Sequence, residues 1–247
     1  MFDTISKEYD GLNRVISFGI DIKWRKKVVE IIGKSYPDKI LDIATGTGDL
    51  AINLTKTKAS KIIGLDISEG MLNVGRKKIE KLQLNNQIEM VFGDSENIPF
   101  EANYFDAITV AFGVRNFENL EKGLSEIYRV LKPNGTFVVL ETSIPTKTPY
   151  KQGYKFYAKY ILPLIGKLFS KGHGLVLNKI NRLSYGSAES VNLSSIKLNK
   201  IDSLAQIAID SSMTPGLQIL NLFGRSTHPI NILFSKNTNS DGIEANN

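Results

Sequence analysis

The sequence predicts an α/β fold built on a doubly wound parallel sheet with helices on both sides. Five short apolar runs follow one another along the chain, and amphipathic stretches of helical period separate most of them. The first run ends in a turn with two glycines, Gly46 and Gly48. Three of the runs have an aspartate at or near their end, namely Asp42, Asp66 and Asp94, which places carboxylates at the carboxyl edge of the sheet, where such folds bind ligands.

The order of the elements follows from hydrophobic period and from turn chemistry. Residues 5–33 have helical stripes that are interrupted at 17–21, and Ser68 is placed to cap a helix. Asn134 and Gly135 follow Pro133 and predict a turn at 132–135. The predicted strands are 39–44, 61–67, 88–94, 105–112 and 136–141, and the predicted helices after residue 33 are 49–57, 69–82 and 119–132.

Composition excludes several classes of function. The chain has 247 residues and no cysteine, which rules out a disulfide framework, a thiolate metal site and a cysteine nucleophile. Its two histidines, His173 and His228, lack nearby ligand partners, so no metal is expected. A net charge of +6 is too small to indicate a nucleic-acid partner. The N-terminus does not resemble a signal peptide and the longest apolar run, 160–169, is too short for a bilayer, so a cytoplasmic location is expected.

The acidic strand ends indicate which cofactor the sheet binds. Asp66 lies 18 residues after Gly48, near the spacing at which a carboxylate accepts the hydroxyls of an adenosine ribose. Asp94 and Ser95 follow the third strand, where an adenine amino group would lie. Together with Asp42, these carboxylates would repel a pyrophosphate and would attract a positively charged ligand. S-adenosylmethionine carries a sulfonium, an ammonium and a ribose, and no phosphate.

An NAD-dependent oxidoreductase is the alternative. The dinucleotide pattern needs a third glycine, but this chain has Ala51 near that place. Tyr128 and Lys132 have the Tyr-x-x-x-Lys spacing of short-chain dehydrogenases. They lie at the end of a predicted helix, where Tyr128 is expected to pack and Lys132 to act as a helix-terminal cation.

Several motifs resemble those of the class I methyltransferases, whose core is Rossmann-like, and within them the family that C-methylates quinone precursors in menaquinone and ubiquinone biosynthesis. The resemblance covers about residues 1–171. It is carried by Met1-Phe-Asp-x-Ile-x-x-x-Tyr-Asp10, Leu12-Asn-Arg14, Ser17-Phe-Gly-Ile-Asp21, Trp24-Arg25, Leu41-Asp-Ile-Ala-Thr-Gly-Thr-Gly-Asp-Leu-Ala51, Gly64-Leu-Asp-Ile-Ser68, Gly70-Met71, Phe112-Gly-Val-Arg-Asn116 and Tyr128-Arg-Val-Leu-Lys-Pro133.

The resemblance implies an S-adenosylmethionine-dependent C-methyltransferase, which would act on a 2-polyprenyl naphthoquinol (demethylmenaquinol to menaquinol) or a related polyprenyl benzoquinol. Ala111 replaces a serine that the family often has, so that side-chain contact is absent here. Together, the residues and the resemblance assign cofactor binding to Asp42, Thr45, Gly46, Thr47, Gly48, Asp66, Asp94 and Ser95.

Methyl transfer to a ring carbon needs an ionised ortho hydroxyl and a base that assists its ionisation. Arg115 and Asn116 follow the fourth strand, where Arg115 would lower a phenol pKa and Asn116 would orient the ring. Asp21 is the second choice of base; Tyr9 and Asn13 share its N-terminal region, which commonly covers the site in class I methyltransferases. Trp24 is expected in the core.

The segment 147–171 reads as a helical insertion that would form one wall of a polyprenyl channel or would simply pack on the core. Its lysines fit peripheral contact with an anionic membrane surface, and they fit a solvated helix face equally well. The sequence leaves the oligomeric state open, with a homodimer as one option. The lysines are Lys147, Lys151, Lys155, Lys159 and Lys167.

Beyond Lys171 the family landmarks stop abruptly, and the last 77 residues hold 11 Ser and 10 Asn. One explanation is a frameshift near codon 172, which would leave the sixth and seventh strands missing or imitated and the fifth strand an exposed edge. A catalytically impaired protein with the methyltransferase fold is then a third alternative. The expected organisation is an N-terminal helical cap (1–36), a cofactor-binding core (37–146), the insertion (147–171), an atypical segment (172–235) and a disordered tail (236–247).

Overall fold

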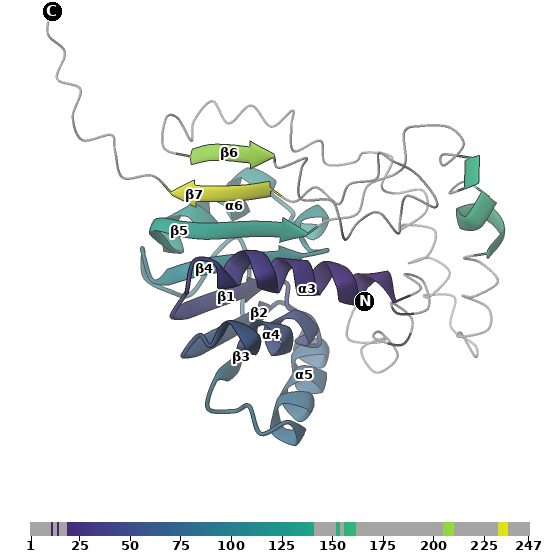
Figure 1. Cartoon of the computed structure of the whole chain (residues 1–247), viewed down its shortest axis with the longest axis horizontal. Coiled ribbons are helices and arrows are strands. Elements are labelled where there is room, and N and C mark those ends of the chain that lie inside the picture. Colours follow the sequence, from purple (N-terminus) through teal and green to yellow (C-terminus); the bar gives the residue numbers. More distant parts are fainter. Residues whose placement is uncertain are drawn as a thin grey trace, which may run out of the picture.

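The computed structural model describes residues 11, 14, 19–140, 152–153, 156–161, 205–209 and 232–236, the last two ranges as backbone. Their centre is a sheet in the order β3-β2-β1-β4-β5-β7-β6 (Figure 1). The first five strands of this order are mutually parallel, which confirms the predicted α/β fold class, and β7 runs antiparallel to both β5 and β6. The strands are β1 (Lys39–Ile43), β2 (Lys61–Asp66), β3 (Ile88–Phe92), β4 (Phe105–Ala111), β5 (Leu131–Leu140), β6 (Ala205–Ile209) and β7 (Ile232–Lys236).

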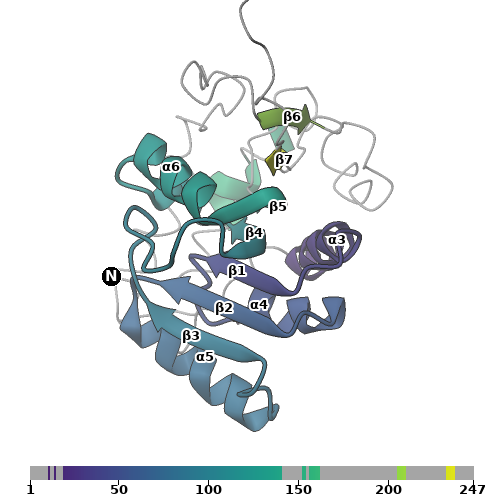
Figure 2. The same cartoon turned by 90° about the vertical axis from the view of Figure 1, so that its left-hand side faces the viewer.

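Helices cover both faces of the sheet (Figure 2). One apolar cluster joins the sheet to α3, α4 and α5, and a second cluster joins the opposite face to α6. Two faces that are both buried explain why the strands read as continuous apolar runs. The helices are α3 (Ile20–Gly33), α4 (Asp49–Leu54), α5 (Glu69–Lys81) and α6 (Leu120–Val130), with short turns of 3₁₀-helix at η1 (Thr55–Thr57) and η2 (Val114–Asn116) and of π-helix at η3 (Tyr157–Ile161).

Local signals set where these helices begin. Ser68 caps α5 as predicted, because its hydroxyl accepts a hydrogen bond from the backbone N–H of Met71 at 3.3 Å. Asn119 caps α6 in the same way through the N–H of Lys122 at 3.1 Å. Helix α3 begins directly after Gly19, whose φ is 71°. Gly19 lies within the predicted interruption at 17–21 of the N-terminal helical region.

The predicted turn at 132–135 is part of β5. Leu131 pairs with Phe105, and the next pair joins Thr136 to Ala107, so the residues between them bulge out of the ladder. Pro133 has no N–H to contribute to a ladder, which accounts for the irregularity. Helix α6 ends at Val130. The prediction that Lys132 is a cation at the C-terminal end of this helix is therefore wrong.

The outer edge of β5 is paired. Residues Thr136 to Val139 of β5 align with Ile232 to Ser235 of β7, and β7 in turn pairs with β6. The expectation that β5 would be an exposed edge is therefore corrected. Other expectations fall outside the described residues, namely those for Tyr9, Asn13, most of the insertion 147–171, His173, His228 and the tail 236–247 beyond Lys236, which is the last residue of β7.

Among the described residues, the structure contains no helix with the length and apolar character needed to cross a bilayer.

Candidate active site

The loop after β1 turns sharply through alternating left-handed residues. Ala44, Gly46 and Gly48 have φ values of 53°, 59° and 77°, and the N–H of Gly48 donates to the carbonyl of Thr45 at 3.0 Å. A positive φ costs glycine little, which explains the glycines at two of these positions. The loop therefore has a defined shape that depends on its sequence.

Asp66 connects this loop to the next helix. At the carboxyl end of β2, its Oδ2 accepts from the N–H of Gly46 and its Oδ1 from the N–H of Ser68, both at 2.8 Å. A carboxylate oxygen can accept more than one hydrogen bond, so these contacts are compatible with ligand hydroxyls. The predicted cofactor residue Asp66 thus lies at the predicted strand end and also fixes the position of Gly46.

Asp42 lies beneath the loop, with only 1% of its surface exposed. Its Oδ2 accepts from the hydroxyl of Thr45 and its Oδ1 from the hydroxyl of Thr109, both at 2.7 Å. Burial raises the pKa of Asp42 to about 6, although these two hydroxyls and the charge of Arg25 act in the opposite direction. The structure therefore brings Asp42 to the loop from below, where it positions Thr45.

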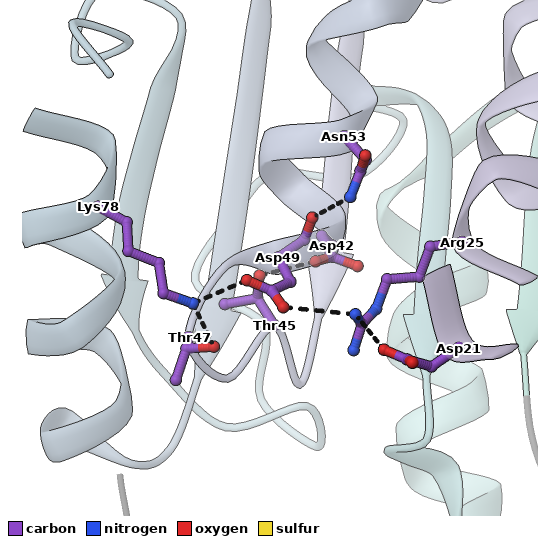
Figure 3. Close-up of polar contacts among 8 residues, drawn as sticks. All are labelled: Asp21, Arg25, Asp42, Thr45, Thr47, Asp49, Asn53 and Lys78. Atoms are coloured by element: carbon purple, nitrogen blue, oxygen red, sulfur yellow. Dashed lines mark hydrogen bonds and ion pairs between the residues drawn. The ribbon is translucent and has the colours of Figure 1, made fainter. Parts of the chain in front are cut away.

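Asp49, the first residue of α4, joins three elements through its carboxylate (Figure 3). Lys78 of α5 donates to Asp49 Oδ1 at 2.7 Å and to the hydroxyl of Thr47 at 3.0 Å. Arg25 of α3 lies 3.3 Å from Asp49 Oδ2 and forms a 2.8 Å ion pair with Asp21. The loop is therefore held to α3 and to α5 by charged groups.

A cleft of about 170 Å³, partly open to solvent, lies at the carboxyl ends of β1, β2, β3 and β4. Of the predicted site residues, the structure brings Asp66, Asp94, Ser95 and Asn116 together there. The other predicted residues (Asp21, Asp42, Thr45, Gly46, Thr47, Gly48 and Arg115) do not line it. The lining residues are Ile43, Ala44, Leu65, Asp66, Ile67, Gly93, Asp94, Ser95, Glu96, Gly113, Asn116, Phe117 and Glu118.

Sequence reasoning missed several residues of this cleft. Ile67 is 64% exposed beside Asp66, although its sequence context placed it in a buried strand. The sequence does contain a signal for the exposure of Ile67, because an apolar residue that follows an acidic strand end has already left the sheet. Gly113 was also missed: a Cβ there would lie 2.4 Å from the Cβ of Ala44, so only glycine lets the ends of β1 and β4 approach this closely.

The three catalytic candidates have different surroundings. Asn116 is exposed in η2 and lines the cleft, and its amide lies 3.5 Å from the carbonyl of Phe112. Arg115, its neighbour in η2, is half-buried. Asp21 is 3% exposed and is held by Arg25, so its carboxylate is occupied in the ion pair at the start of α3. The geometry therefore favours η2 over Asp21 for contact with a substrate.

The geometry argues against the dehydrogenase alternative. Lys132 donates to Asp106 Oδ1 at 2.7 Å, and Asp106 is the second residue of β4. This pair therefore lies at the amino edge of the sheet, opposite to the cleft. At the cleft edge, the N–H of Gly46 is bonded to Asp66, and Asp49 places a negative charge at the start of α4, where a pyrophosphate would need a positive field.

Within the described part of the chain, no group of three or more histidine and acidic side chains is arranged to hold a metal ion.

Comparisons with known proteins agree with this geometry. A family model described as the ubiE/COQ5 methyltransferase family matches residues 1–175. A demethylmenaquinone methyltransferase of Bacteroides fragilis is 49% identical over 172 residues, which are 69% of this chain and 70% of the relative. A ubiquinone/menaquinone biosynthesis C-methyltransferase UbiE of Geotalea daltonii is 46% identical over 173 residues, which are 69% of this chain and 74% of the relative.

A solved structure supports the fold alone. It is described as an S-adenosyl-L-methionine-dependent methyltransferase of Methanococcus maripaludis, with a TM-score of 0.64 and 22% sequence identity. The alignment covers 99% of this chain and 97% of that one. The likeness at this identity concerns the fold, whereas the family model ends at residue 175.

Proposed function

Because this chain belongs to the ubiE/COQ5 methyltransferase family, we propose that it methylates a ring carbon of a 2-polyprenyl naphthoquinol, converting demethylmenaquinol to menaquinol. It is an S-adenosylmethionine-dependent C-methyltransferase of class I. The naphthoquinol substrate is supported by demethylmenaquinone methyltransferase relatives at up to 49% identity. A polyprenyl benzoquinol is a second substrate, supported by the relative whose name includes ubiquinone biosynthesis.

The residues of the cleft suit S-adenosylmethionine. Asp66 would accept from the ribose hydroxyls, and the exposed side chain of Ile67 would pack on the adenine. Asp94 and Ser95 also line the cleft and would recognise the adenine amino group. When bound, the cofactor supplies an activated methyl group on a positively charged sulfur.

The glycine loop would hold the amino-acid end of the cofactor. Thr45, Gly46, Thr47 and Gly48 form this loop, and its shape is supported by Asp42 from below and by Lys78 from the side. The cofactor assignment rests on the aspartates at the strand ends beside this loop, Asp42, Asp66 and Asp94. One of them, Asp66, already accepts a hydrogen bond from the N–H of Gly46. Such a site attracts a cation and offers little to a pyrophosphate.

The chain's remaining task is to orient the quinol ring, promote ionisation of its ortho hydroxyl and exclude water. In this proposal Arg115 stabilises the ionised hydroxyl by its charge, and Asn116, which lines the cleft, orients the ring. The ring carbon would form the new bond to the methyl group as the bond from that methyl to the sulfonium breaks, with its electron pair left on sulfur, so that S-adenosylhomocysteine leaves. The ring carbon would then lose its proton to a base or to water. Asp21 stays the second choice of base, and its ion pair with Arg25 would have to open for that role.

The cofactor assignment is tested by calorimetric titration of the purified chain with S-adenosylmethionine and with NADH. We expect binding of S-adenosylmethionine alone, and D66N should weaken it, since asparagine has one acceptor oxygen where Asp66 uses two, for the N–H groups of Gly46 and Ser68. Binding of NADH in place of S-adenosylmethionine would support the oxidoreductase alternative. A comparison of demethylnaphthoquinol with the matched benzoquinol tests the substrate preference.

We also propose peripheral contact at the inner face of the membrane, where a polyprenyl quinol resides. Phe156 and Tyr160 are 58% and 55% exposed, and the ammonium of Lys159 lies 5.3 Å from the centre of the Tyr160 ring. Aromatic side chains beside a cation are typical of membrane interfaces. Co-sedimentation with anionic vesicles should exceed that with neutral vesicles, and equal sedimentation would contradict the contact.

A further inference from the structure

Lys78 reaches from α5 to both sides of Gly48 in the glycine loop (Figure 3). Its ammonium donates to the hydroxyl of Thr47 at 3.0 Å and to the carboxylate of Asp49 at 2.7 Å. These partners immediately precede and follow the glycine, whose φ is 77°. One side chain therefore contacts the residue before Gly48 and the residue after it.

The packing of α5 makes this reach feasible. Gly75 lies one turn before Lys78, and a Cβ at Gly75 would lie 3.3 Å from the backbone carbonyl of Thr47 and 2.5 Å from Met90 Cε. The missing side chain lets α5 approach the loop directly. A loop with two glycines loses much backbone entropy when it is ordered, so a contact that orders it in advance lowers the cost of binding.

The charges around Lys78 are balanced within the protein. Asp49 also receives Arg25 at 3.3 Å, and the side chains of Lys78 and Asp49 are 27% and 19% exposed. The ammonium of Lys78 is thus bound by the side chains of Thr47 and Asp49, and through them it can restrain the shape of the loop.

We propose that Lys78 is a positioning residue that holds the glycine loop in its cofactor-binding shape. The inference rests on the proposed function, because it assigns a role in binding S-adenosylmethionine. Lys78 would not contact the cofactor; it would act through Thr47 and Asp49.

The test compares K78M, which keeps most of the aliphatic stem, with K78R and with the matched control K77M. Lys77 is an exposed lysine on the same helix. Calorimetry with S-adenosylmethionine and with S-adenosylhomocysteine should show that K78M raises both dissociation constants about tenfold, the loss expected for one charge-assisted hydrogen-bond site. K78R should recover most of the affinity, and K77M should match the wild type. In turnover assays, K78M should raise KM for S-adenosylmethionine and leave kcat nearly unchanged.

Other outcomes overturn the inference. S-adenosylhomocysteine lacks the sulfonium charge, so an effect of the Lys78 charge on the sulfonium would change only the affinity for S-adenosylmethionine. A merely structural role would lower the melting temperature and the active fraction of K78M and leave both dissociation constants unchanged. If wild type binds S-adenosylmethionine and K78M binds it equally well, only the role of Lys78 fails. If wild type itself does not bind, the proposed function fails with it.

Discussion

At Asp42, burial raises the pKa of the carboxyl, whereas its hydrogen bonds and the charge of Arg25 lower it. It lies in register with Thr109 on the neighbouring strand β4, and the two hydroxyls of Thr45 and Thr109 satisfy its oxygens. Burial nevertheless dominates and raises its pKa to about 6 from the ordinary value of 3.8. The ionised carboxylate of Asp42, which holds Thr45 in place, therefore lowers the free energy of unfolding at neutral pH.

The pH dependence of stability tests this assignment. Since the pKa of Asp42 is raised in the folded state, the native protein binds more protons than the unfolded chain between the two pKa values, and its stability falls as the pH rises through this window. The D42N variant does not titrate there. Its free energy of unfolding relative to wild type should rise by about 2 kcal/mol between about pH 4.5 and about pH 7, as measured by urea unfolding. A difference that does not change with pH would contradict the raised pKa.

At the scale of elements, the site depends on how closely the ends of β1 and β4 approach each other. Gly113 follows β4, and the Cβ of Ala44 at the end of β1 occupies the space into which a side chain would extend. Both residues line the cleft. The separation of the two strand ends thus determines the position of η2, which carries Arg115 and Asn116.

Substitution of Gly113 by alanine tests this close contact. The new Cβ would lie 2.4 Å from a Cβ fixed to the backbone, so G113A should lower the free energy of unfolding by about 1–3 kcal/mol and should also reduce turnover. The control is G33A at the end of α3, where the nearest atom, Thr57 Cγ2, is 3.9 Å away. G33A should be neutral or stabilising by up to about 1 kcal/mol. Equal effects of the two variants in chemical denaturation would rule out the steric explanation.

The elements themselves were largely predictable from the sequence. The core strands and α5 agree with hydrophobic period and with the Ser68 cap, because these signals are local. The sequence predicts a turn at 132–135 where the structure has a bulge in β5. Pro133 and Asn134 are typical of a turn and of a bulge alike, so the local sequence does not distinguish the two. The reach of Lys78 to Thr47 depends on a neighbour far along the chain, which no local pattern contains.

At the scale of the whole molecule, the sequence match and the sheet end at different places. The family model stops at residue 175, whereas β6 and β7 lie beyond residue 200 and complete the sheet next to β5. The abrupt change of sequence near Lys171 was predictable, but the pairing of the later segments with β5 was not, because short apolar runs do not specify their partners.

The role of the last two strands is tested by proline substitution. Leu233 lies in the middle of β7 and aligns with Val138 of β5 and Ala208 of β6. A proline in a strand paired on both sides removes a ladder hydrogen bond and leaves its partner carbonyl unpaired, so L233P should lower the free energy of unfolding by about 1–3 kcal/mol and reduce the melting temperature. The control L233V keeps the backbone N–H and should have a much smaller effect. An unchanged melting temperature in L233P would mean that β7 does not support the sheet.

We further propose that a frameshift near codon 172 produced the atypical C-terminal segment. The resemblance leads us to expect, beyond residue 171, a family landmark of the form Ala-Tyr-x-Tyr-Leu. The other reading frames of the gene downstream of Ser170 should then encode this stretch. Sequencing of the gene and inspection of both frames is the measurement, and the absence of that stretch from both would contradict the frameshift.

The proposed reaction is tested most directly by incubating the purified full chain with demethylmenaquinol and S-adenosylmethionine that carries a deuterated methyl group. Mass spectrometry should detect a menaquinol whose mass has increased by one deuterated methyl on the ring, together with S-adenosylhomocysteine in equal amount. Bound S-adenosylmethionine without any labelled quinol would contradict the assignment of this chain as a quinol C-methyltransferase and would favour a catalytically impaired protein that keeps the fold.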